Sequence, residues 1–559
     1  MTTTPTAAAT TAPVTASNDD VARLAAEPLI RDGRIGGVSP IDLTDLPPVT
    51  CTPLADVPAI MQRARDAQPA WAALGFRQRA KLMKAAARRM LQDYDGILAI
   101  MAREAGKLTV EGLMTEALGP LDFTNGWIAV AKPVLTRRTK LGIPLPFWLF
   151  MGKRARLDRP PRGVVGIITP WNYPLGVFFK PVIPALLAGN AVVVKPSEQT
   201  PRAGQWFVEH LQAVLPANVV QVVHGGGDAG AEVLKHVDAA VFTGSVATGR
   251  KVAVQCAERL IPVSLELGGK DPAIVCADAP LERTAAGVTN WALHNTGQNC
   301  GAIERVYVVD AIADRFVARL TSAFKRLRVG TGLPGENPDA LDISPMNNAM
   351  QLRIVEDHVA DAVAKGATLL AGGTRDGMSG LAYPPTLLDH CTHDMKIVAD
   401  ETFGPVLPII RVRDEAEAVR MANDSRYGLN ASVWTGDLAK GKRLALQLQA
   451  GTVFVNNHAV SGAMAACPWT GVKESGYGVA NSVLALEVFT RPRTLFYDTS
   501  RQCDPFWFPL DGDLHRMGRD IATAQLTPLK LILNPVRLVK FLAANLRRPG
   551  TIKKFFSQD

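Results

Sequence analysis

Cys300 lies in an unusually polar stretch of the sequence, 294–308, which reads HNTGQNCGAIERVYV. Cysteines with a structural role are usually buried among apolar neighbours, where they act as small hydrophobic side chains. The neighbours of Cys300 are small or polar, and an apolar run begins only after it. This setting suits a nucleophile, which needs access and a stabilised thiolate, although this stretch alone leaves a structural cysteine equally open.

Two further side chains could assist such a thiol. Glu266 ends an apolar run and is followed by two glycines, a setting in which a partly desolvated carboxylate suits general-base chemistry. Asn172, in the motif WNYP, offers an amide donor that could hold a developing oxyanion. Each also has an ordinary explanation, because Glu266 could pair with a lysine and Asn172 could be a simple turn residue.

Two segments carry residues that could bind a nucleotide. Lys195 and Glu198 follow the run AVVV, where a lysine and a carboxylate can bind ribose hydroxyls. Gly244, Ser245 and Gly249 lie in FTGSVATG, where glycines admit a phosphate and a helix N-terminus supplies free N–H groups. This segment is not the G-x-G-x-x-G fingerprint in its strict form. A solvated surface pair and an ordinary glycine turn are the alternatives.

Glu401 and Phe403, in ETFGP, precede another apolar run and could meet a sugar and a flat ring.

Like the other candidates, they lie beside a short apolar run. Two series of such runs predict the strands that position the candidate residues. The first series is GVVGIIT, AVVVKP, VVQVVHG, AAVFTGS and PVSLELGG. The second series is DPAIVCAD, ERVYVVD, GPVLPIIRV, NASVWTG and GTVFVNN.

Runs that are apolar throughout, with helix-like segments between them, are typical of parallel strands covered on both faces. Before them, apolar residues between Val57 and Lys107 recur at three- and four-residue spacing, which predicts consecutive amphipathic helices. The sequence therefore predicts an α/β protein with two lobes, and a ligand cleft between them.

The composition is that of a soluble globular protein, with 47% hydrophobic and 20% charged residues. The seven cysteines are scattered without a CxxC pair, which argues against a disulfide framework or zinc site and for a reducing compartment. No metal is expected. Without a secretory signal or a membrane-length apolar run, we expect a cytoplasmic protein.

The net charge is +9, but it is unevenly distributed. Residues 525–559 contain seven basic residues and one acidic residue, which supply +6 of it. The rest of the chain is close to neutral, which argues against a nucleic-acid partner.

Together these motifs resemble the aldehyde dehydrogenase superfamily. PWNYP, KPSE, FTGS, LELGGKDP, GQNC, ETFGP and YGLNASVW occur in the family's order between about Val57 and Leu495. GQNCGAIERVYV and the extended C-terminus resemble a branch with bacterial succinate-semialdehyde dehydrogenases and membrane-associated relatives. The fold that this implies is two doubly wound α/β domains, a Rossmann-like NAD domain and a catalytic thiol domain, plus a small β oligomerisation arm.

The domain boundaries expected on this basis are a disordered tail at 1–45, the NAD-binding domain at 46–137 and 161–267, the catalytic domain at 268–465, the arm at 138–160 and 466–499, and a basic amphipathic extension at 500–559. Such arms pair subunits in the family, so a homodimer or homotetramer is expected. The apolar segment PFWLF in the arm fits a partner surface.

The resemblance also implies roles. Cys300 corresponds to the nucleophile that forms a thiohemiacetal and then a thioester, Glu266 to the general base that activates water, and Asn172 to the oxyanion donor, together with the Cys300 backbone N–H. The implied cofactor-binding residues are Trp171, Lys195, Glu198, Gly225, Gly244, Ser245, Gly249, Glu401 and Phe403. Because a carboxylate at Glu198 repels a 2′-phosphate, NAD is favoured over NADP.

The substrate channel implied by the resemblance is lined by Val177, Phe178, Lys180, Asn299 and Gly301. Lys180 could hold the carboxylate of succinate semialdehyde, or it could simply extend out of its helix into solvent. The chain departs from the family pattern at Pro181, where many members have lysine, and at Ala480, where many have an acidic residue. An auxiliary proton relay through those two positions is therefore doubtful.

Three further alternatives remain open from the sequence. A CoA-acylating enzyme would resolve the thioester with a thiol, but Glu266 argues against it. A catalytically silent scaffold is the non-enzyme alternative, and the intact Cys300, Glu266 and Asn172 argue against that. The basic C-terminal extension could lie on an anionic membrane surface, which would favour fatty aldehydes, or pack on the protein or a partner subunit. Within it, Pro535 predicts two short helices in place of one long one.

Overall fold

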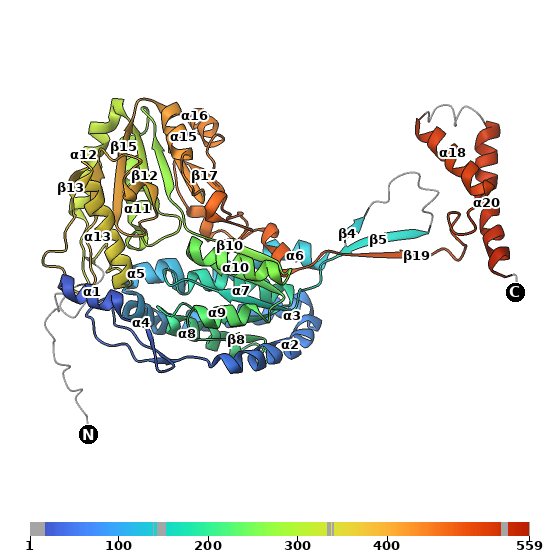
Figure 1. The fold of residues 1–559 in the computed structure, drawn as a ribbon, viewed down its shortest axis with the longest axis horizontal. Helices are drawn as coiled ribbons and strands as arrows, with labels where there is room; N and C mark the ends of the chain where they lie inside the picture. The colour runs from blue at the N-terminus through green and yellow to red at the C-terminus, as the bar shows by residue number, and fades with distance from the viewer. Residues whose placement is uncertain are drawn as a thin grey trace, which may run out of the picture. The chain divides into compact units, whose positions relative to one another are not determined.

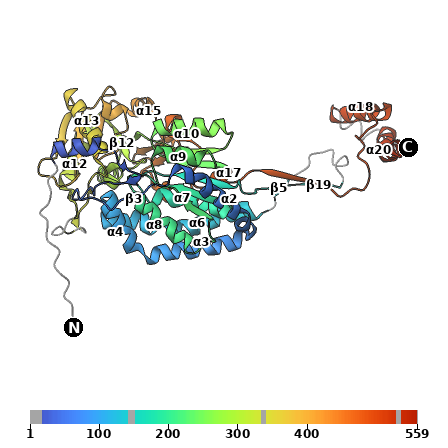
Figure 2. The same ribbon diagram turned by 60° about the horizontal axis from the view of Figure 1, so that its bottom comes forward.

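The computed structural model describes residues 17–137, 139–141, 152–332, 337, 340–526 and 535–557. The chain divides into two compact units. The first unit is formed by Met1–Thr136 and Pro160–Arg491, and the second by Arg137–Arg159 and Pro492–Asp559. Figures 1 and 2 show the elements of each unit.

The predicted N-terminal helices are confirmed as α2 (Val57–Ala73), α3 (Gly75–Gln92) and α4 (Tyr94–Ala105). The short helix α5 (Thr109–Gly112) and the long helix α6 (Gly119–Thr136) follow them. Each of the three predicted helices buries residues at three- and four-residue spacing, as the sequence pattern requires.

Residues 18–45, expected to belong to a disordered tail, instead form defined elements. Helix α1 (Asn18–Ala26) begins with a capping box in which Ser17 and Asp20 bond each other's backbone N–H groups. Its Val21 is buried against α13 (Ala349–Ala364). Strands β1 (Ile30–Arg31) and β2 (Arg34–Ile35) pair with β3 (Val49–Thr50). The helix cap and the buried valine stabilise this segment, which composition alone did not predict.

The first sheet has the order β18-β10-β9-β6-β7-β8. Its five parallel strands correspond to the five runs of the first predicted series: β6 (Val164–Ile168), β7 (Ala191–Lys195), β8 (Val220–Val222), β9 (Ala239–Thr243) and β10 (Val263–Glu266). The strand order reverses between β6 and β9, so the crevice at their carboxyl ends is the expected ligand site.

Helices cover both faces of this sheet. Alternate strand residues such as Val165 and Val192 pack with α3, α6, α7 (Gly176–Ala188) and α8 (Pro201–Gln212). Their neighbours, such as Val164 and Val193, pack with α2, α9 (Gly227–Leu234) and α10 (Val246–Glu258). Burial on both faces explains why the runs are apolar throughout.

The second sheet has the order β13-β14-β15-β12-β11-β16-β17. Its strands are β11 (Asp271–Val275), β12 (Ile303–Val309), β13 (Thr368–Ala371), β14 (Thr386–Asp389), β15 (Val406–Val412), β16 (Asn430–Trp434) and β17 (Thr452–Val455). The covering helices are α11 (Leu281–Leu293) and α12 (Asp310–Arg326) on one face, and α13 and α15 (Glu415–Asn423) on the other. The predicted two doubly wound α/β domains are thereby confirmed.

The second unit contains an antiparallel sheet with the order β19-β5-β4. Its strands are β4 (Thr139–Leu141), β5 (Lys153–Asp158) and β19 (Arg493–Asp498), from the two segments predicted to form the arm. Residues 466–491, also assigned to the arm, instead belong to the first unit, where β18 (Gly476–Tyr477) pairs with β10. The segment PFWLF lies outside the described residues.

Helices α18 (Gly512–Leu526) and α20 (Pro535–Phe556) form the rest of the second unit. Pro535 is the first residue of α20, where its missing N–H group removes no helical hydrogen bond. Arg548 anchors α20, because its buried guanidinium bonds Asp511 and the carbonyl oxygens of Pro505, Trp507 and Pro509. Among the described residues, no helix combines the length and apolar character that crossing a membrane requires.

Candidate active site

The structure brings Cys300 and Glu266 together from two different sheets. Cys300 lies in the turn before β12, and Glu266 is the last residue of β10. The Cys300 Sγ is 3.8 Å from Glu266 Oε1, within hydrogen-bond reach for a thiol donor. The indole Nε1 of Trp469 donates to the same oxygen at 2.5 Å. The Glu266 carboxylate is therefore fixed in direction, with its Oε1 next to the sulfur.

The Cys300 side chain is only partly exposed. Burial of the sulfur raises the pKa of Cys300 well above its ordinary value of 9.0, the nearby Glu266 carboxylate raises it further, and Lys180 opposes both effects. This differs from the expected stabilised thiolate, because the site disfavours a negative sulfur next to a carboxylate. At neutral pH the thiol keeps its proton, and Glu266 is the adjacent acceptor for it.

Asn172 lies beside the Cys300 turn. Its side-chain Nδ2 donates to the backbone oxygen of Gln298 at 3.1 Å. Its own backbone oxygen accepts from Lys107 Nζ at 3.2 Å and from Asn295 Nδ2 at 2.9 Å. Asn295 and the next residue, Thr296, both have a φ of 56°, a left-handed conformation that is uncommon without glycine. Backbone strain therefore accumulates in the turn that presents Cys300.

A buried ion pair that the motifs do not reveal holds the Asn172 loop. Lys107 Nζ lies 2.6 Å from Glu116 Oε1, and both side chains are buried. The other oxygen of Glu116 accepts from the backbone N–H groups of Leu175 and Gly176 at 2.7 and 2.9 Å, at the start of α7. The one available signal was a lysine and a glutamate inside mainly apolar helical sequence, which does not identify their partners.

The predicted ribose-binding pair lies at the carboxyl end of β7. Lys195 is 4% exposed, and its Nζ lies 2.8 Å from Glu198 Oε2. At the end of β9, Gly244 leads into α10, which Ser245 caps by accepting from the Thr248 backbone N–H at 3.3 Å. A Cβ atom on Gly249 would lie 2.4 Å from the Leu267 side chain, which would have to move if α10 carried a larger residue there.

Gly225 lies after β8, at the start of α9. A Cβ atom on it would lie 2.6 Å from the Ala229 Cβ, and its φ is 154°. Gly225, Gly227 and Gly230 also have the G-x-G-x-x-G spacing, although β8 is an edge strand and not one of the strands at which the order reverses. This motif match is therefore weaker evidence for a nucleotide than the residues at the ends of β6, β7 and β9.

The other end of the expected cofactor site lies around Glu401. The Glu401 Oε1 accepts from the Gly269 backbone N–H at 3.1 Å. Burial, reinforced by the nearby Glu304 carboxylate, raises the pKa of Glu401 to about 8. Phe403 meets the ring of Trp171 edge-on, with 5.5 Å between ring centroids. The donors and acceptors of this region fit a dinucleotide, since carboxylates and a lysine suit ribose hydroxyls and aromatic rings suit flat bases.

A second buried pair, also unpredicted, supports this region. Glu304 accepts from the backbone N–H groups of Thr402 and Phe403 at 2.8 and 2.9 Å, and Lys270 Nζ lies 2.5 Å from it. Glu304 comes four residues after Cys300 and therefore connects the cysteine turn to the Glu401 loop. A charged residue in the run AIERVYV was the sequence signal for it.

The expected substrate-channel residues are only partly brought together. Lys180 lies with its Nζ 5.7 Å from the centroid of the Trp469 ring, and Val177 lines the same small cavity as Lys180 and Glu266. Asn299 Oδ1 accepts from the Gly301 backbone N–H at 3.0 Å and is 3.9 Å from Cys300 Sγ.

Phe178 does not belong to this group. It is 1% exposed and packs against Phe207 in the hydrophobic core, with ring centroids 5.6 Å apart. Helical periodicity explains the difference, because adjacent residues of a helix face different directions. The expected place of Phe178 in the channel is therefore not supported.

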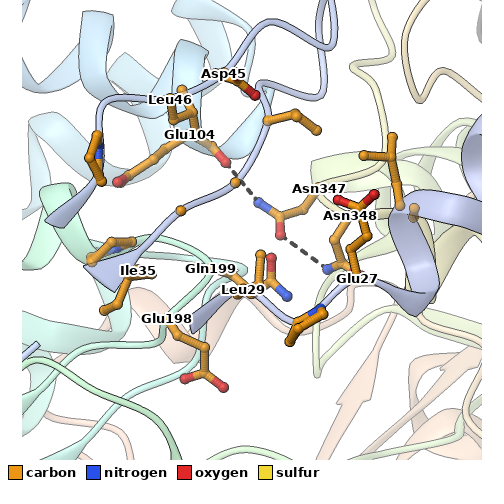
Figure 3. Close-up of a pocket in the computed structure, with 18 of the residues that line it drawn as sticks. Glu27, Leu29, Ile35, Asp45, Leu46, Glu104, Glu198, Gln199, Asn347 and Asn348 are labelled. Carbon is orange, nitrogen blue, oxygen red and sulfur yellow. Dashed lines mark hydrogen bonds between the residues drawn. The ribbon is translucent and has the colours of Figure 1, made fainter. Parts of the chain in front are cut away.

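A larger cavity of about 510 Å³ adjoins Glu198 (Figure 3). The segment between Leu24 and Pro48 forms much of its wall, together with Glu104, Asn347 and Asn348. Asn347 Nδ2 donates to the Glu104 backbone oxygen at 3.2 Å, which connects two parts of this wall. The N-terminal segment, which the sequence left outside the folded domains, thus contributes to the surroundings of the cofactor candidates.

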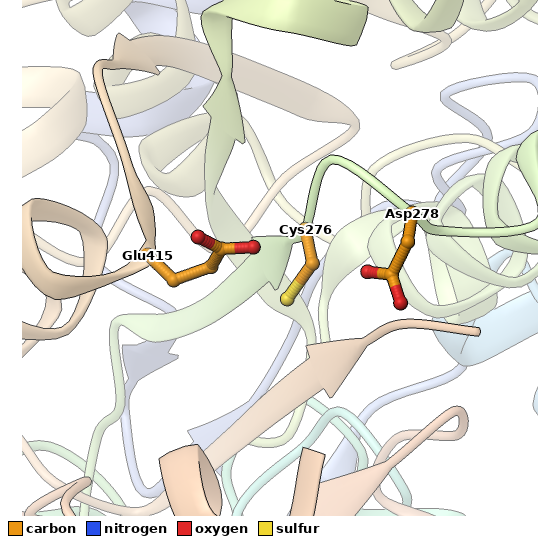
Figure 4. Close-up of side chains that lie close together, drawn as sticks. All are labelled: Cys276, Asp278 and Glu415. Atoms are coloured by element: carbon orange, nitrogen blue, oxygen red, sulfur yellow. The ribbon is translucent and has the colours of Figure 1, made fainter. Parts of the chain in front are cut away.

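Cys276, Asp278 and Glu415 lie close enough to hold a metal ion (Figure 4). However, Lys440 Nζ lies 2.6 Å from Asp278 Oδ1 and 3.2 Å from Glu415 Oε1. The lysine ammonium already supplies the positive charge that these carboxylates need. This cluster is accordingly a structural ion-pair network and not a candidate metal centre.

The model of the aldehyde dehydrogenase family matches residues 31–495. A 4,4′-diapolycopene aldehyde oxidase from Methylomonas sp is 37% identical over 85% of this chain and 88% of its own length. A putative succinate-semialdehyde dehydrogenase [NADP(+)] from Mycolicibacterium smegmatis is 37% identical over 83% of this chain and 88% of its own length.

Solved structures with the same fold include lactaldehyde dehydrogenase from Escherichia coli, with a TM-score of 0.77 and 31% identity over 84% of this chain and 96% of the other. A second is an NADP-dependent glyceraldehyde-3-phosphate dehydrogenase from Bacillus halodurans, solved with NADP. It has a TM-score of 0.76 and 34% identity over 84% of this chain and 96% of the other.

Proposed function

Because this chain belongs to the aldehyde dehydrogenase family, we propose that Cys300 is its nucleophile, Glu266 its general base and Asn172 its oxyanion donor. The chain is an oxidoreductase that converts an aldehyde to the carboxylic acid with a nicotinamide cofactor. The observation that carries the residue assignment is the 3.8 Å contact between Cys300 Sγ and Glu266 Oε1, made between two separate sheets.

In the acylation step, Glu266 takes the thiol proton and the thiolate attacks the aldehyde carbon. The resulting thiohemiacetal oxyanion is stabilised by the Asn172 amide and the Cys300 backbone N–H. A bound nicotinamide would supply the hydride acceptor for the substrate carbon. Glu266 releases the thiol proton to solvent before the second step. The thioester left on Cys300 is then hydrolysed, with Glu266 removing a proton from the attacking water. The carbon–sulfur bond breaks, its electron pair returns to sulfur, and the acid leaves.

Trp171, Lys195, Gly244, Ser245 and Glu401 are the residues that we expect to hold the cofactor. We propose NAD as the preferred form, because the Glu198 carboxylate would repel a 2′-phosphate. The name of one relative favours NADP instead, since the Mycolicibacterium protein is named for NADP(+). Parallel kinetics with both cofactors decide between them, and Glu198→Ala should raise kcat/KM with NADP relative to NAD if the carboxylate sets the preference.

Two substrate classes are proposed, and Lys180 separates them. A semialdehyde carries a carboxylate that the Lys180 ammonium could neutralise, and one relative is named a succinate-semialdehyde dehydrogenase. An aliphatic aldehyde would need no such cation. Purified protein should be assayed by NADH absorbance with succinate semialdehyde and an aliphatic series of increasing chain length.

Lys180→Ala should raise KM for the semialdehyde and leave the aliphatic series unchanged if Lys180 binds the carboxylate. Lys81→Ala, at an exposed position of α3, is the matched control. An equal effect on both classes would contradict this role for Lys180. Added CoA should not accelerate turnover, because hydrolysis assisted by Glu266 resolves the thioester.

We also propose that the β19-β5-β4 sheet pairs subunits. Strand β19 is an edge strand, and its Leu495, Phe496 and Tyr497 are 39%, 53% and 45% exposed. An exposed apolar edge strand is prone to pair with another chain. Light scattering of the purified protein should therefore give the mass of a dimer or tetramer, and a monomer would contradict the proposal.

The C-terminal helices are proposed to contact an anionic membrane surface from the cytoplasmic side. Val536, Val539, Phe555 and Phe556 of α20 are more than half exposed. Exposed cations accompany them on the same helix, namely Lys540, Arg547, Lys553 and Lys554, and α20 contains no acidic residue. A basic amphipathic helix of this kind can lie in the headgroup region with its apolar side inserted. The alternative is that the extension packs on another copy of the chain.

A further inference from the structure

Residues 505–510, between β19 and α18, form a loop with a run of exposed apolar side chains, and we call them the aromatic loop. Its large apolar residues Phe506, Trp507, Phe508 and Leu510 are 42%, 54%, 61% and 69% exposed. Single exposed hydrophobic residues are common on protein surfaces. A contiguous group of large ones instead marks a surface that contacts another molecule or a membrane.

The backbone of the aromatic loop is bonded from inside the second unit. Arg548 of α20 is 2% exposed, and its guanidinium bonds three carbonyl oxygens of the loop, those of Pro505, Trp507 and Pro509. The Trp507 N–H donates to the Asp504 backbone oxygen at 3.0 Å. The two prolines have no N–H group to satisfy. The loop therefore exposes its apolar side chains while much of its polar backbone is bonded within the protein.

This arrangement suits a lipid surface. Where lipid excludes water, an unbonded peptide group is costly, because the acyl chains offer it no hydrogen-bond partner. A loop whose backbone is already bonded internally can insert its side chains without that cost. A protein partner imposes no such requirement, since it can bond the loop backbone itself. Tryptophan also favours the boundary between lipid and water, because its ring is apolar and its indole N–H is polar.

The charges around the aromatic loop favour an anionic surface. Two carboxylates flank the loop, and both are paired: Asp504 Oδ1 lies 2.5 Å from Lys153 Nζ, and Asp511 pairs with Arg548. Helix α20, which Arg548 connects to the loop, carries exposed cations and no acidic residue. Stable attachment to a bilayer takes two signals, such as an apolar anchor and a polybasic patch. The loop and the helix provide one of each.

We propose that the aromatic loop is the apolar anchor of a membrane-binding surface, and that the cations of α20 are its electrostatic partner. The surface that it binds is a bilayer containing anionic lipid. This inference rests on the proposed membrane contact of the C-terminal extension, and it adds an anchor that lies outside the helices. On binding, the side chains of Phe506, Trp507 and Phe508 enter the headgroup region, while Arg548 keeps the loop carbonyl oxygens bonded.

The first test replaces Trp507 and Phe508 together by serine. Both side chains are exposed, so the folded protein should tolerate the change. Binding to phosphatidylcholine vesicles that contain phosphatidylserine should weaken by about tenfold per replaced residue, the lower end of what burying an apolar side chain contributes. Leu260→Ser with Leu446→Ser is the matched control, because these leucines of the first unit are 93% and 88% exposed. The control should bind as the wild type does.

A second test follows the fluorescence of Trp507 with vesicles whose acyl chains are brominated, which quench tryptophans that enter the bilayer. Trp507→Phe keeps an apolar ring and should still bind. The chain has nine tryptophans, so the difference between wild type and variant reports on this position. Quenching should be smaller in the variant. Equal quenching of the two proteins would place residue 507 outside the lipid and overturn the proposal.

The remaining outcomes separate this inference from the proposals on which it rests. Unchanged vesicle binding by the serine variant overturns the anchor, even if binding still depends on phosphatidylserine and α20 therefore contacts the membrane. A smaller mass of that variant in light scattering, with unchanged vesicle binding, would show that the loop packs on another copy of the chain. No vesicle binding by the wild type would reject the membrane contact as a whole. The catalytic proposal is tested separately, by NADH formation without vesicles.

Discussion

Cys300 and Glu266 influence each other's chemistry because they share a short, partly buried contact. The carboxylate that we propose removes the thiol proton also raises the pKa of Cys300, which makes a negative sulfur harder to form. A motif scan locates both residues but does not reveal this opposition, which depends on the 3.8 Å separation.

We expect Glu266→Gln to lower steady-state turnover by about 10²–10⁴-fold, the range for loss of a general base. The same change removes a negative charge near the sulfur, so the pKa of Cys300 should fall towards its ordinary value. Alkylation of Cys300, followed by peptide mass spectrometry across a pH series, should then show its midpoint at lower pH than in the wild type. An unchanged midpoint would mean that burial alone sets the thiol pKa.

Glu401 should make stability depend on pH. Its pKa of about 8 in the folded protein lies above the ordinary 4.5, so between these values the folded state holds a proton that the unfolded state releases. The free energy of unfolding contributed by Glu401 therefore falls as pH rises through this window. In cofactor-free protein, Glu401→Gln should be more stable relative to the wild type at pH 9 than at pH 5, as measured by Tm. A constant difference would contradict the raised pKa.

Sequence motifs predicted the residues that lie at strand ends but not those that hold them in place. Cys300, Glu266 and Asn172 each belong to a short motif with its own local chemistry. Trp469 bonds Glu266 across 203 positions, and Lys107 and Glu116 bond the backbone of Asn172, Leu175 and Gly176, which lies 59 to 65 positions away. Nothing local identifies these partners. Ion pairs and hydrogen bonds of this kind become visible only when the elements are assembled.

At the scale of elements, the loop that carries Glu401 depends on β12. Glu304, near the start of that strand, bonds the backbone of Thr402 and Phe403, and Lys270 neutralises it. A single buried carboxylate thus connects the cysteine turn to a loop about a hundred residues later. Local rearrangement of either segment should disturb the other.

Lys270→Met should destabilise the protein by about 3–5 kcal/mol, because it leaves the buried Glu304 charge without a partner. Lys396→Met removes an exposed ion pair with Asp357 and should cost only about 0–1 kcal/mol. Urea unfolding of both variants compares the two costs directly. Similar losses in the free energy of unfolding of the two variants would mean that another group neutralises Glu304.

The strands were predictable because both faces of each sheet are covered, which makes their sequence continuously apolar. The first helix was not, because a Thr/Ala/Pro-rich N-terminus suggested disorder by composition. The capping residues Ser17 and Asp20 were the available signal. Strand β18 contains only two residues, too few for a periodic pattern, so its place in the first sheet could not be predicted.

For the whole molecule, the uneven charge has a clear physical consequence. The excess of cations in the C-terminal extension is accompanied by exposed apolar side chains on α20. Attraction to anionic lipid and insertion of apolar groups would act together there. The rest of the chain, being nearly neutral, adds little long-range attraction.

We expect the protein to float with phosphatidylcholine vesicles only when these also contain phosphatidylserine. Lys553→Gln with Lys554→Gln should weaken this binding by about 1 kcal/mol per lysine, and added salt should weaken it further. Lys325→Gln with Arg326→Gln, at the end of α12, is the matched control. Equal binding to neutral vesicles would contradict the role of the cations, and binding to neither kind would favour packing of the extension on another copy of the chain.

The hydrogen bond between Trp469 and Glu266 spans 203 positions of the chain. During synthesis, Glu266 and Cys300 leave the ribosome long before Trp469 does. A nascent chain that ends before Trp469 therefore has the five parallel strands of the first sheet and Cys300, but it lacks the indole that orients Glu266. With Glu266 as the proposed base, we expect incomplete translation products that end before Trp469 to be inactive.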